Sequence, residues 1–207
     1  MRFLLVMIAL ATAWTAKAQG TFEAVVGYNN NAVIRTFSGT AGWTFQATNF
    51  ISVTELGCLA NFFPGNNTTN PIQVGLWAPS GVLLASSSIT PASTLFNQSL
   101  YESVAPVLLN PGQTYHIGAY FPEGLFSLDA AIPSFGGSVT NSAEIRLLGA
   151  ALRDGGFASP LPDPGTEGGA YLGPNLRYRG DIPEPASAAL LGLGALLLAA
   201  CRKSRPL

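Results

Sequence analysis

Charged side chains are scarce in this 207-residue sequence, where they make up 10% of all residues. A typical soluble domain has about 25%. No lysine occurs between Lys17 and Lys203, and the acids of the middle region outnumber its cations, which are Arg35, Arg146, Arg153, Arg177 and Arg179. This balance lacks the basic surface of a nucleic-acid-binding protein, so we expect no nucleic-acid partner. Because 48% of the residues are apolar, we expect a packed domain rather than disorder.

Histidine and cysteine are almost missing. His116 is the single histidine, and Cys58 and Cys201 are the two cysteines. One histidine and one cysteine in the middle region are fewer ligands than a zinc site normally has. Cys201 lies in an apolar C-terminal run, so we expect no internal disulfide. We interpret Cys58 as a small buried hydrophobe and His116 as a hydrogen-bonded strand residue.

Catalytic motifs are missing as well. The sequence has no Gly-x-Ser-x-Gly nucleophile elbow and no Gly-Lys-Ser/Thr phosphate loop. We therefore predict a protein that is not an enzyme, with no catalytic residue, no metal and no cofactor. A secreted hydrolase that uses a pair of carboxylates remains an alternative, because acids are present throughout the middle region.

The N-terminal end predicts a signal peptide over residues 1–18. Arg2 gives a positive start, residues 3–14 form an apolar run, and Ala16-Lys17-Ala18 fits the small-x-small rule for signal peptidase. The apolar run is too short to span a bilayer comfortably. We expect signal peptidase to cut before Gln19.

The C-terminal end predicts a membrane-directed segment over residues 181–207. Pro183, Glu184 and Pro185 precede an apolar run over residues 186–201, and a basic tip follows with Arg202, Lys203 and Arg205. A helix of this length is about 24 Å long, against a hydrocarbon core of about 30 Å. It can cross the membrane if the basic side chains reach the lipid headgroups. The basic tip is expected to stay on the cytoplasmic side.

This arrangement of motif, helix and basic tip resembles the PEP-CTERM sorting signal of Gram-negative bacteria. The resemblance implies that an exosortase, a membrane enzyme, cleaves near the Pro-Glu-Pro motif. It also implies transient anchoring by the helix, followed by release or transfer to the cell surface or extracellular matrix. A plain membrane anchor that is never cut is the alternative interpretation.

The middle region, residues 19–180, predicts short strands separated by turns. The alternation around Ile72–Leu76 and Tyr115–Phe121 is typical of half-buried strands, and an extra residue near Glu55 indicates a bulge. We expect a long irregular loop, rich in glycine and proline, over Asp154–Asn175. A short helix near Ser142–Leu152, where Ala143, Leu147, Ala150 and Ala151 cluster, is an alternative to a strand over Glu144–Leu148. Turns are predicted at Pro79-Ser80-Gly81 and at Asn110–Gln113, the second of type II. Further strands are expected at Thr21–Val26, Trp43–Ala47, Ile51–Val53, Val82–Leu84, Ser103–Leu109, Glu144–Leu148 and Asn175–Arg179.

This pattern predicts an all-β fold, a single antiparallel β-sandwich of jelly-roll or immunoglobulin-like type. Segments such as Gly42-Trp43-Thr44-Phe45, Gly75-Leu76-Trp77 and Tyr171-Leu-Gly-Pro-Asn-Leu176 resemble a sandwich module of unknown function in bacterial surface proteins. The resemblance implies life outside the cytoplasm and brings no active-site residues with it.

For function we expect a non-catalytic surface or matrix protein that associates with exopolysaccharide. The alternative is a carbohydrate-binding module that contacts sugar through exposed aromatic rings, for which Trp77 and Tyr120 are the candidates. The competing interpretation is that Trp43 and Trp77 pack in the core. The exposure of the rings discriminates between sugar binding and core packing.

Overall fold

The computed structural model describes residues 20–29, 36–62, 71–127, 130–131, 133 and 137–180 of the chain. Apart from one 3-10 turn, η1 (Ala60–Phe62), the regular elements of this part are strands. The predicted signal peptide and the predicted membrane-directed segment both lie outside the described residues. None of the described segments forms a helix with the length and hydrophobicity needed to cross a bilayer.

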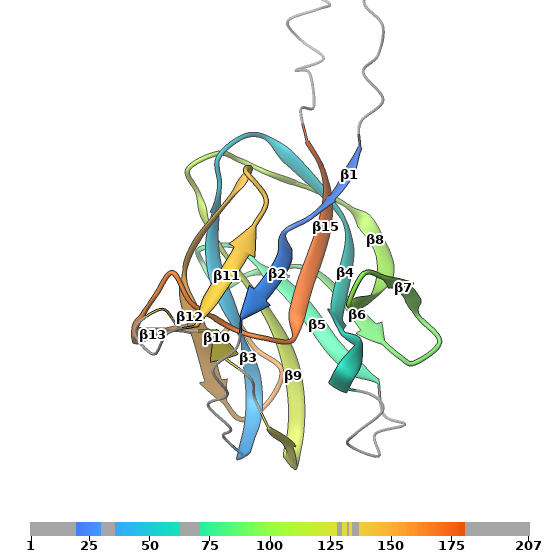
Figure 1. The fold of residues 1–207 in the computed structure, drawn as a ribbon, viewed down its shortest axis with the longest axis vertical. Coiled ribbons are helices and arrows are strands. Elements are labelled where there is room, and N and C mark those ends of the chain that lie inside the picture. Colours follow the sequence, from blue (N-terminus) through green and yellow to red (C-terminus); the bar gives the residue numbers. More distant parts are fainter. Residues whose placement is uncertain are drawn as a thin grey trace, which may run out of the picture.

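Two main antiparallel sheets form the fold (Figure 1). The five-stranded sheet has the order β1-β15-β4-β8-β7, and the six-stranded sheet has the order β13-β12-β3-β9-β5-β6. Two small pairs, β10-β14 and β11-β2, complete it. The strands are β1 (Thr21–Glu23), β2 (Val25–Asn29), β3 (Thr36–Ala47), β4 (Ile51–Leu59), β5 (Ile72–Trp77), β6 (Leu83–Ile89), β7 (Thr94–Phe96), β8 (Ser99–Leu109), β9 (Thr114–Ser127), β10 (Ala130–Ala131), β11 (Ser138–Asn141), β12 (Ile145–Asp154), β13 (Leu161–Glu167), β14 (Ala170–Tyr171) and β15 (Pro174–Gly180).

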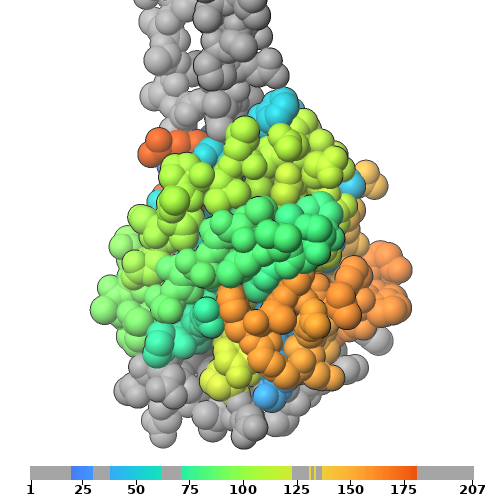
Figure 2. Space-filling model, turned by 180° about the vertical axis from the view of Figure 1, so that it is seen from behind, coloured from blue at the N-terminus to red at the C-terminus, as the bar shows by residue number. Residues whose placement is uncertain are grey.

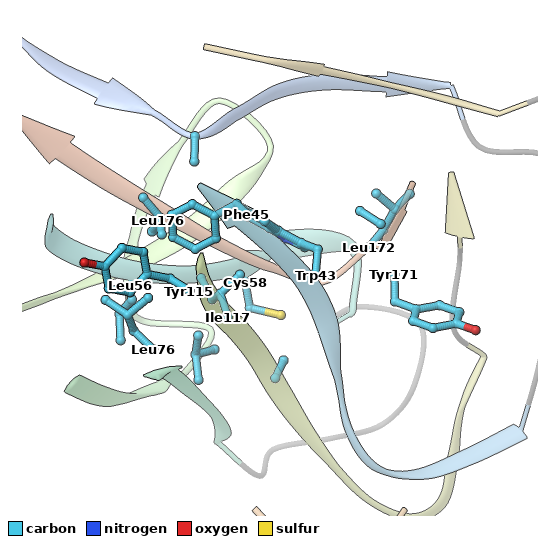
Figure 3. Packing of buried hydrophobic residues seen from close by; sticks show 14 of the residues in the cluster. Trp43, Phe45, Leu56, Cys58, Leu76, Tyr115, Ile117, Tyr171, Leu172 and Leu176 are labelled. Atoms are coloured by element: carbon cyan, nitrogen blue, oxygen red, sulfur yellow. The ribbon is translucent and has the colours of Figure 1, made fainter. Parts of the chain in front are cut away.

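The prediction of an all-β fold with antiparallel sheets is confirmed. The alternation of β9 places Tyr115, Ile117, Ala119 and Phe121 in the core, as predicted. Both main sheets contribute to one hydrophobic cluster, with Leu56 and Leu176 from one sheet facing Phe45, Leu76 and Ile117 from the other (Figure 3). Burial of this apolar surface is the main stabilising contribution to the fold.

The turns follow their sequence chemistry. Gly81 and Gly112 have φ angles of 80° and 74°, a backbone region that costs a side-chain-bearing residue energy. Gly112 occupies the third position of the Asn110–Gln113 turn, where type II geometry requires a positive φ. The predicted bulge near Glu55 is confirmed by a register shift between Val53 and Glu55 in the pairing of β4 with β8.

The strand predicted over Glu144–Leu148 is confirmed and the alternative of a short helix near Ser142–Leu152 is wrong, because Ile145–Asp154 forms strand β12. Two of the alanines that suggested a helix, Ala150 and Ala151, are buried where two strands flank β12. Ala150 lies opposite Trp43, and Ala151 lies opposite Gly42 on one side and Pro162 on the other. Tertiary pairing here overrides the helix propensity of alanine.

The long loop predicted over Asp154–Asn175 is also wrong, because it contains β13 and β14. Pro162 and Pro164 indicated irregular structure, but β13 is the edge strand of the six-stranded sheet. A proline at an edge does not remove a hydrogen bond from the interior of the ladder. The strand predicted over Thr21–Val26 is interrupted at Ala24, where the chain passes from the five-stranded sheet to the β2-β11 pair.

Close strand packing at Gly42 predicts a strong effect of substitution. A Cβ atom at this position would lie 2.1 Å from the carbonyl oxygen of Ile117 and 2.8 Å from the Cα of Gly118. Because both obstacles are backbone atoms, we expect Gly42→Ala to lower the free energy of unfolding by roughly 1–3 kcal/mol or more. Urea denaturation of the full chain measures the change.

Gly156→Ala is the matched control, since nothing lies within 4 Å of a Cβ atom there. We expect it to leave the stability within about 0.5 kcal/mol of the parent. Equal stabilities of the two variants would contradict the close approach of β3 and β9.

Candidate functional site

The first predicted sugar contact, Trp77, is covered. Its side chain is 3% exposed, and the ring of Phe157 lies against it with 5.1 Å between ring centroids. Trp77 therefore presents no open ring face, whereas the sugar-contact prediction requires an exposed ring. Tyr120 is half-buried on the same outer face of the six-stranded sheet, between Gln73 and Thr40 on the neighbouring strands. Its contact with sugar stays a prediction.

The strap formed by residues 155–160 covers this face. It connects β12 with β13, and Thr40 holds it: the Thr40 hydroxyl donates to the carbonyl of Gly156 at 3.2 Å and accepts from the amide of Ala158 at 3.2 Å. Figure 2 shows the orange part of the chain lying against the green surface of β5 and the following hairpin. The strap thus replaces solvent over the Trp77 ring, one of the two rings that the sequence suggested as sugar contacts.

A row of glycines makes room for the strap. Gly42, Gly118 and Gly75 lie opposite one another on β3, β9 and β5. A Cβ atom on Gly75 would lie 2.6 Å from the ring of Phe157, and one on Gly118 would lie 3.2 Å from Pro160. The absence of side chains in this row allows the strap to pack directly on the sheet.

His116 lies next to Trp77 on the six-stranded sheet and pairs with a hydroxyl group. Its Nδ1 is 3.0 Å from the Thr44 hydroxyl, and its strand neighbours across the sheet are Thr44 and Trp77. Burial lowers the pKa of His116 below its ordinary value. Cys58 is fully buried in the core, as predicted, and burial raises the pKa of its thiol. A thiol of this kind is unreactive, because the thiolate is the nucleophile.

A hollow among the described residues lies elsewhere, on the five-stranded sheet. This cleft has a volume of about 420 Å³ and lies between β2 and the tip of the β7–β8 hairpin. Its lining residues come from β1, β2, the end of β4, the hairpin tip and β15. They are Glu23, Val25, Val26, Gly27, Tyr28, Leu59, Asn97, Gln98, Ser99 and Asn175. Segments far apart in the sequence therefore build it together.

Glu23 is the single charged residue among the described residues that line the cleft, and it is 6% exposed. One carboxylate oxygen accepts a hydrogen bond of 2.5 Å from the Asn97 amide, and the other accepts one of 2.7 Å from the Tyr101 hydroxyl. Two donors of this kind satisfy a buried carboxylate. Burial and the neighbouring Glu23 raise the pKa of Tyr101, so its hydroxyl stays protonated as a donor.

Arg177 lies beside this carboxylate, on the neighbouring strand β15. Its guanidinium donates to Glu55 at 2.6 Å and lies over the Phe96 ring, 4.1 Å from the centroid. The Tyr101 ring is 5.6 Å away. These contacts hold the cation between an acid and two aromatic rings, where it neutralises part of the buried negative charge.

Asn175 fixes the wall that carries β2. Its amide oxygen accepts from the amides of Val25, at 3.1 Å, and Leu176, at 2.9 Å, while its amide nitrogen donates to the carbonyl of Val25 at 2.9 Å. The side chain thereby acts as a strand partner for Val25, immediately after the chain has left the five-stranded sheet at Ala24.

Comparison with protein families identifies the middle of the chain. The model of the domain of unknown function DUF4082 matches residues 27–158, more than half of the chain. The chain belongs to the DUF4082 family. A second model, the PEP-CTERM protein-sorting motif, matches residues 181–203. This motif is typical of exported proteins that an exosortase processes at the membrane. No match to a curated protein was found.

The DUF4082 match and the resemblance to a surface-protein module agree. The match ends at residue 158, whereas β15 lies inside the five-stranded sheet between β1 and β4. Two cleft residues, Glu23 and Asn175, lie on opposite sides of the matched range. The second match contains the sorting residues Pro183, Glu184 and Pro185 and the basic residues Arg202 and Lys203, and Arg205 follows it. All six residues lie outside the described part of the chain.

Sequence reasoning missed the cleft. The available signal was Asn97-Gln98 between Leu95-Phe96 and Ser99-Leu100, which fits a two-residue hairpin loop. Asn97 has a φ of 49°, the one positive value among described residues other than glycine, and asparagine tolerates this region better than most residues. The partner of Asn97, Glu23, is 74 positions away, so no local pattern connects them.

The burial of His116 predicts a pH-dependent stability. Unfolded His116 takes up a proton below about pH 6.5, whereas the folded protein resists it, so the free energy of unfolding should decrease as the pH falls through this range. His116→Gln keeps a polar partner for Thr44 and should remove most of the slope between about pH 7.5 and pH 5.5, where few other side chains titrate. Urea denaturation at both values measures it; identical slopes in both proteins would contradict the shift.

The clamp at Asn175 predicts a large loss on truncation. Asn175→Ala removes three hydrogen bonds and leaves buried backbone groups unpaired, so we expect a loss of roughly 2–4 kcal/mol in the free energy of unfolding. Asn175→Asp retains both accepting interactions but places a carboxylate oxygen against the Val25 carbonyl and adds a buried charge, so it should lose stability as well. If both variants matched the parent in thermal and urea denaturation, the clamp would carry no stability.

Proposed function

We propose that this chain is a non-catalytic exported protein of the cell surface or extracellular matrix, with a body formed by a single antiparallel β-sandwich. An exosortase-type enzyme sorts it through its C-terminal segment, and the mature protein associates with exopolysaccharide. The match of residues 181–203 to the PEP-CTERM motif is the observation that carries the proposal.

The positions of the first and last described strands are consistent with processing at both ends. Thr21 on β1 lies opposite Arg179 on β15, so the two strands end side by side at one end of the fold (Figure 1). Only Asp181 and Ile182 separate the end of β15, Gly180, from the Pro-Glu-Pro motif. A cut near the motif and a cut before Gln19 would both spare the sheet.

A non-catalytic role agrees with the state of the acids near the cleft. The oxygens of Glu23 accept from Asn97 and Tyr101, and Glu55 is paired with Arg177. A glycosidase needs one carboxyl group to give up a proton and another to act as base or nucleophile. The contacts of Glu23 and Glu55 account for their positions in the fold without a catalytic role, which is consistent with a non-catalytic protein.

Intact-mass measurement in a host that contains an exosortase tests the processing. We expect the mature protein to lack residues 1–18 and the segment beyond the Pro-Glu-Pro motif. Replacing Pro183 and Pro185 by alanine should leave the fold intact and abolish cleavage at this end, because alanines do not hold the backbone extended for a protease. A mature wild-type species that still ends at Leu207 would contradict the proposal.

The chain supplies its own matched control. Pro162-Asp163-Pro164 is a second proline–acid–proline sequence, and it lies in the edge strand β13. Replacing Pro162 and Pro164 by alanine should leave the mature mass and the location unchanged apart from the substitutions themselves. Loss of sorting in this variant as well would show that proline content, rather than the C-terminal motif, governs the result.

A further inference from the structure

The cleft between β2 and the β7–β8 hairpin has the size and rigidity of a ligand site. Its volume of about 420 Å³ falls within the range of about 300–1,000 Å³ for small-molecule sites. Its hairpin wall is fixed at two points: Asn97 bonds to Glu23, and the amide of Ala60 donates to the carbonyl of Gln98 at 2.9 Å. Asn175 fixes the opposite wall. Binding to such a preorganised site costs little ordering entropy.

The lining has one polar and one apolar side. The hairpin tip contributes the exposed side-chain amides of Asn97 and Gln98, whereas β2 contributes Val25, Val26 and the ring of Tyr28. Val26 is 52% exposed, so its aliphatic surface is open to a ligand. A sugar ring has the same division, with an apolar C–H face and a rim of hydroxyl groups that both donate and accept hydrogen bonds.

The charges select among polar ligands. The carboxylate of Glu23 in the wall repels anions, and Arg177, whose guanidinium pairs with Glu55 and lies over the Phe96 ring, is not among the residues that line the cleft. A hard cation such as Ca²⁺ takes six to eight oxygen ligands, but both oxygens of Glu23 already accept hydrogen bonds, and no metal-binding group of three or more acids, histidines or cysteines occurs among the described residues. An apolar ligand would leave the amides unpaired.

We propose that this cleft binds neutral saccharides, with the hairpin amides on the hydroxyl groups and β2 against the apolar face of the ring. This inference gives the proposed association with exopolysaccharide a site, and to that extent it rests on the proposed function. It places the site on the five-stranded sheet, away from Trp77 and Tyr120.

Calorimetric titration of the full-length chain tests the cleft directly. The probes are short neutral oligosaccharides of glucose, mannose and galactose, with uronic-acid oligosaccharides as the anionic set. Gln98→Ala removes an exposed amide, and Asn97→Gly removes the second amide while tolerating the positive φ. We expect each variant to weaken binding of the preferred neutral oligosaccharide at least about tenfold, which corresponds to about 1.4 kcal/mol.

Gln113→Ala is the matched control. It makes the same substitution at an exposed position in the Asn110–Gln113 turn, at the opposite end of β8 from the hairpin tip. Binding should be unchanged in this variant, and thermal denaturation should show that all three variants are folded. No binding of any neutral oligosaccharide, equal affinities in all variants, or preference for the uronic-acid set would each overturn the assignment.

Fractionation of the extracellular matrix separates this inference from the proposed function. If wild type and both cleft variants co-purify equally with exopolysaccharide, the protein associates with the matrix through another surface and the cleft assignment fails alone. If the wild type binds oligosaccharides but does not co-purify with exopolysaccharide, the cleft assignment holds and the proposed matrix association fails. Loss of co-purification in Gln98→Ala and Asn97→Gly, but not in Gln113→Ala, supports both.

Discussion

The position of β15 inside the five-stranded sheet is the constraint on which the rest of this structure depends. The last described strand pairs with β1 on one side and β4 on the other, and its Asn175 side chain holds Val25 where the chain leaves this sheet. Trp43, a large core residue of the other sheet, donates from Nε1 to the carbonyl of Pro174 at 3.0 Å. The short strand β15 thus contacts β1, both main sheets and the cleft wall that Asn175 fixes.

Much of this architecture could be predicted from the sequence, because it depends on local patterns. The alternation in β5 and β9 and the glycine in the Asn110–Gln113 turn are short-range signals that tertiary structure had no reason to override. The all-β fold with antiparallel sheets follows from them. Targeting signals are equally local, which is why the PEP-CTERM motif could be identified before any fold was known.

The errors and omissions have a common cause in long-range contacts. Ala150 and Ala151 form a strand because flanking strands bury them, and Pro162 and Pro164 are accepted because β13 is an edge. Trp77 is covered by Phe157 from a strap that the sequence suggested was part of an open loop. Glu23, Asn97 and Asn175 meet only after folding, so the cleft has no sequence motif of its own.

The placement of β15 also governs when the protein can acquire its structure. Ribosomes make the chain from its N-terminus, so β1 is synthesised first and must wait for the final strand before it has any neighbour in its sheet. Until then the edge of β4 that will receive β15 stays open, with its backbone amides and carbonyls unpaired. The five-stranded sheet therefore cannot be completed until residues 174–180 have been made, a property well matched to passage through a narrow translocation channel.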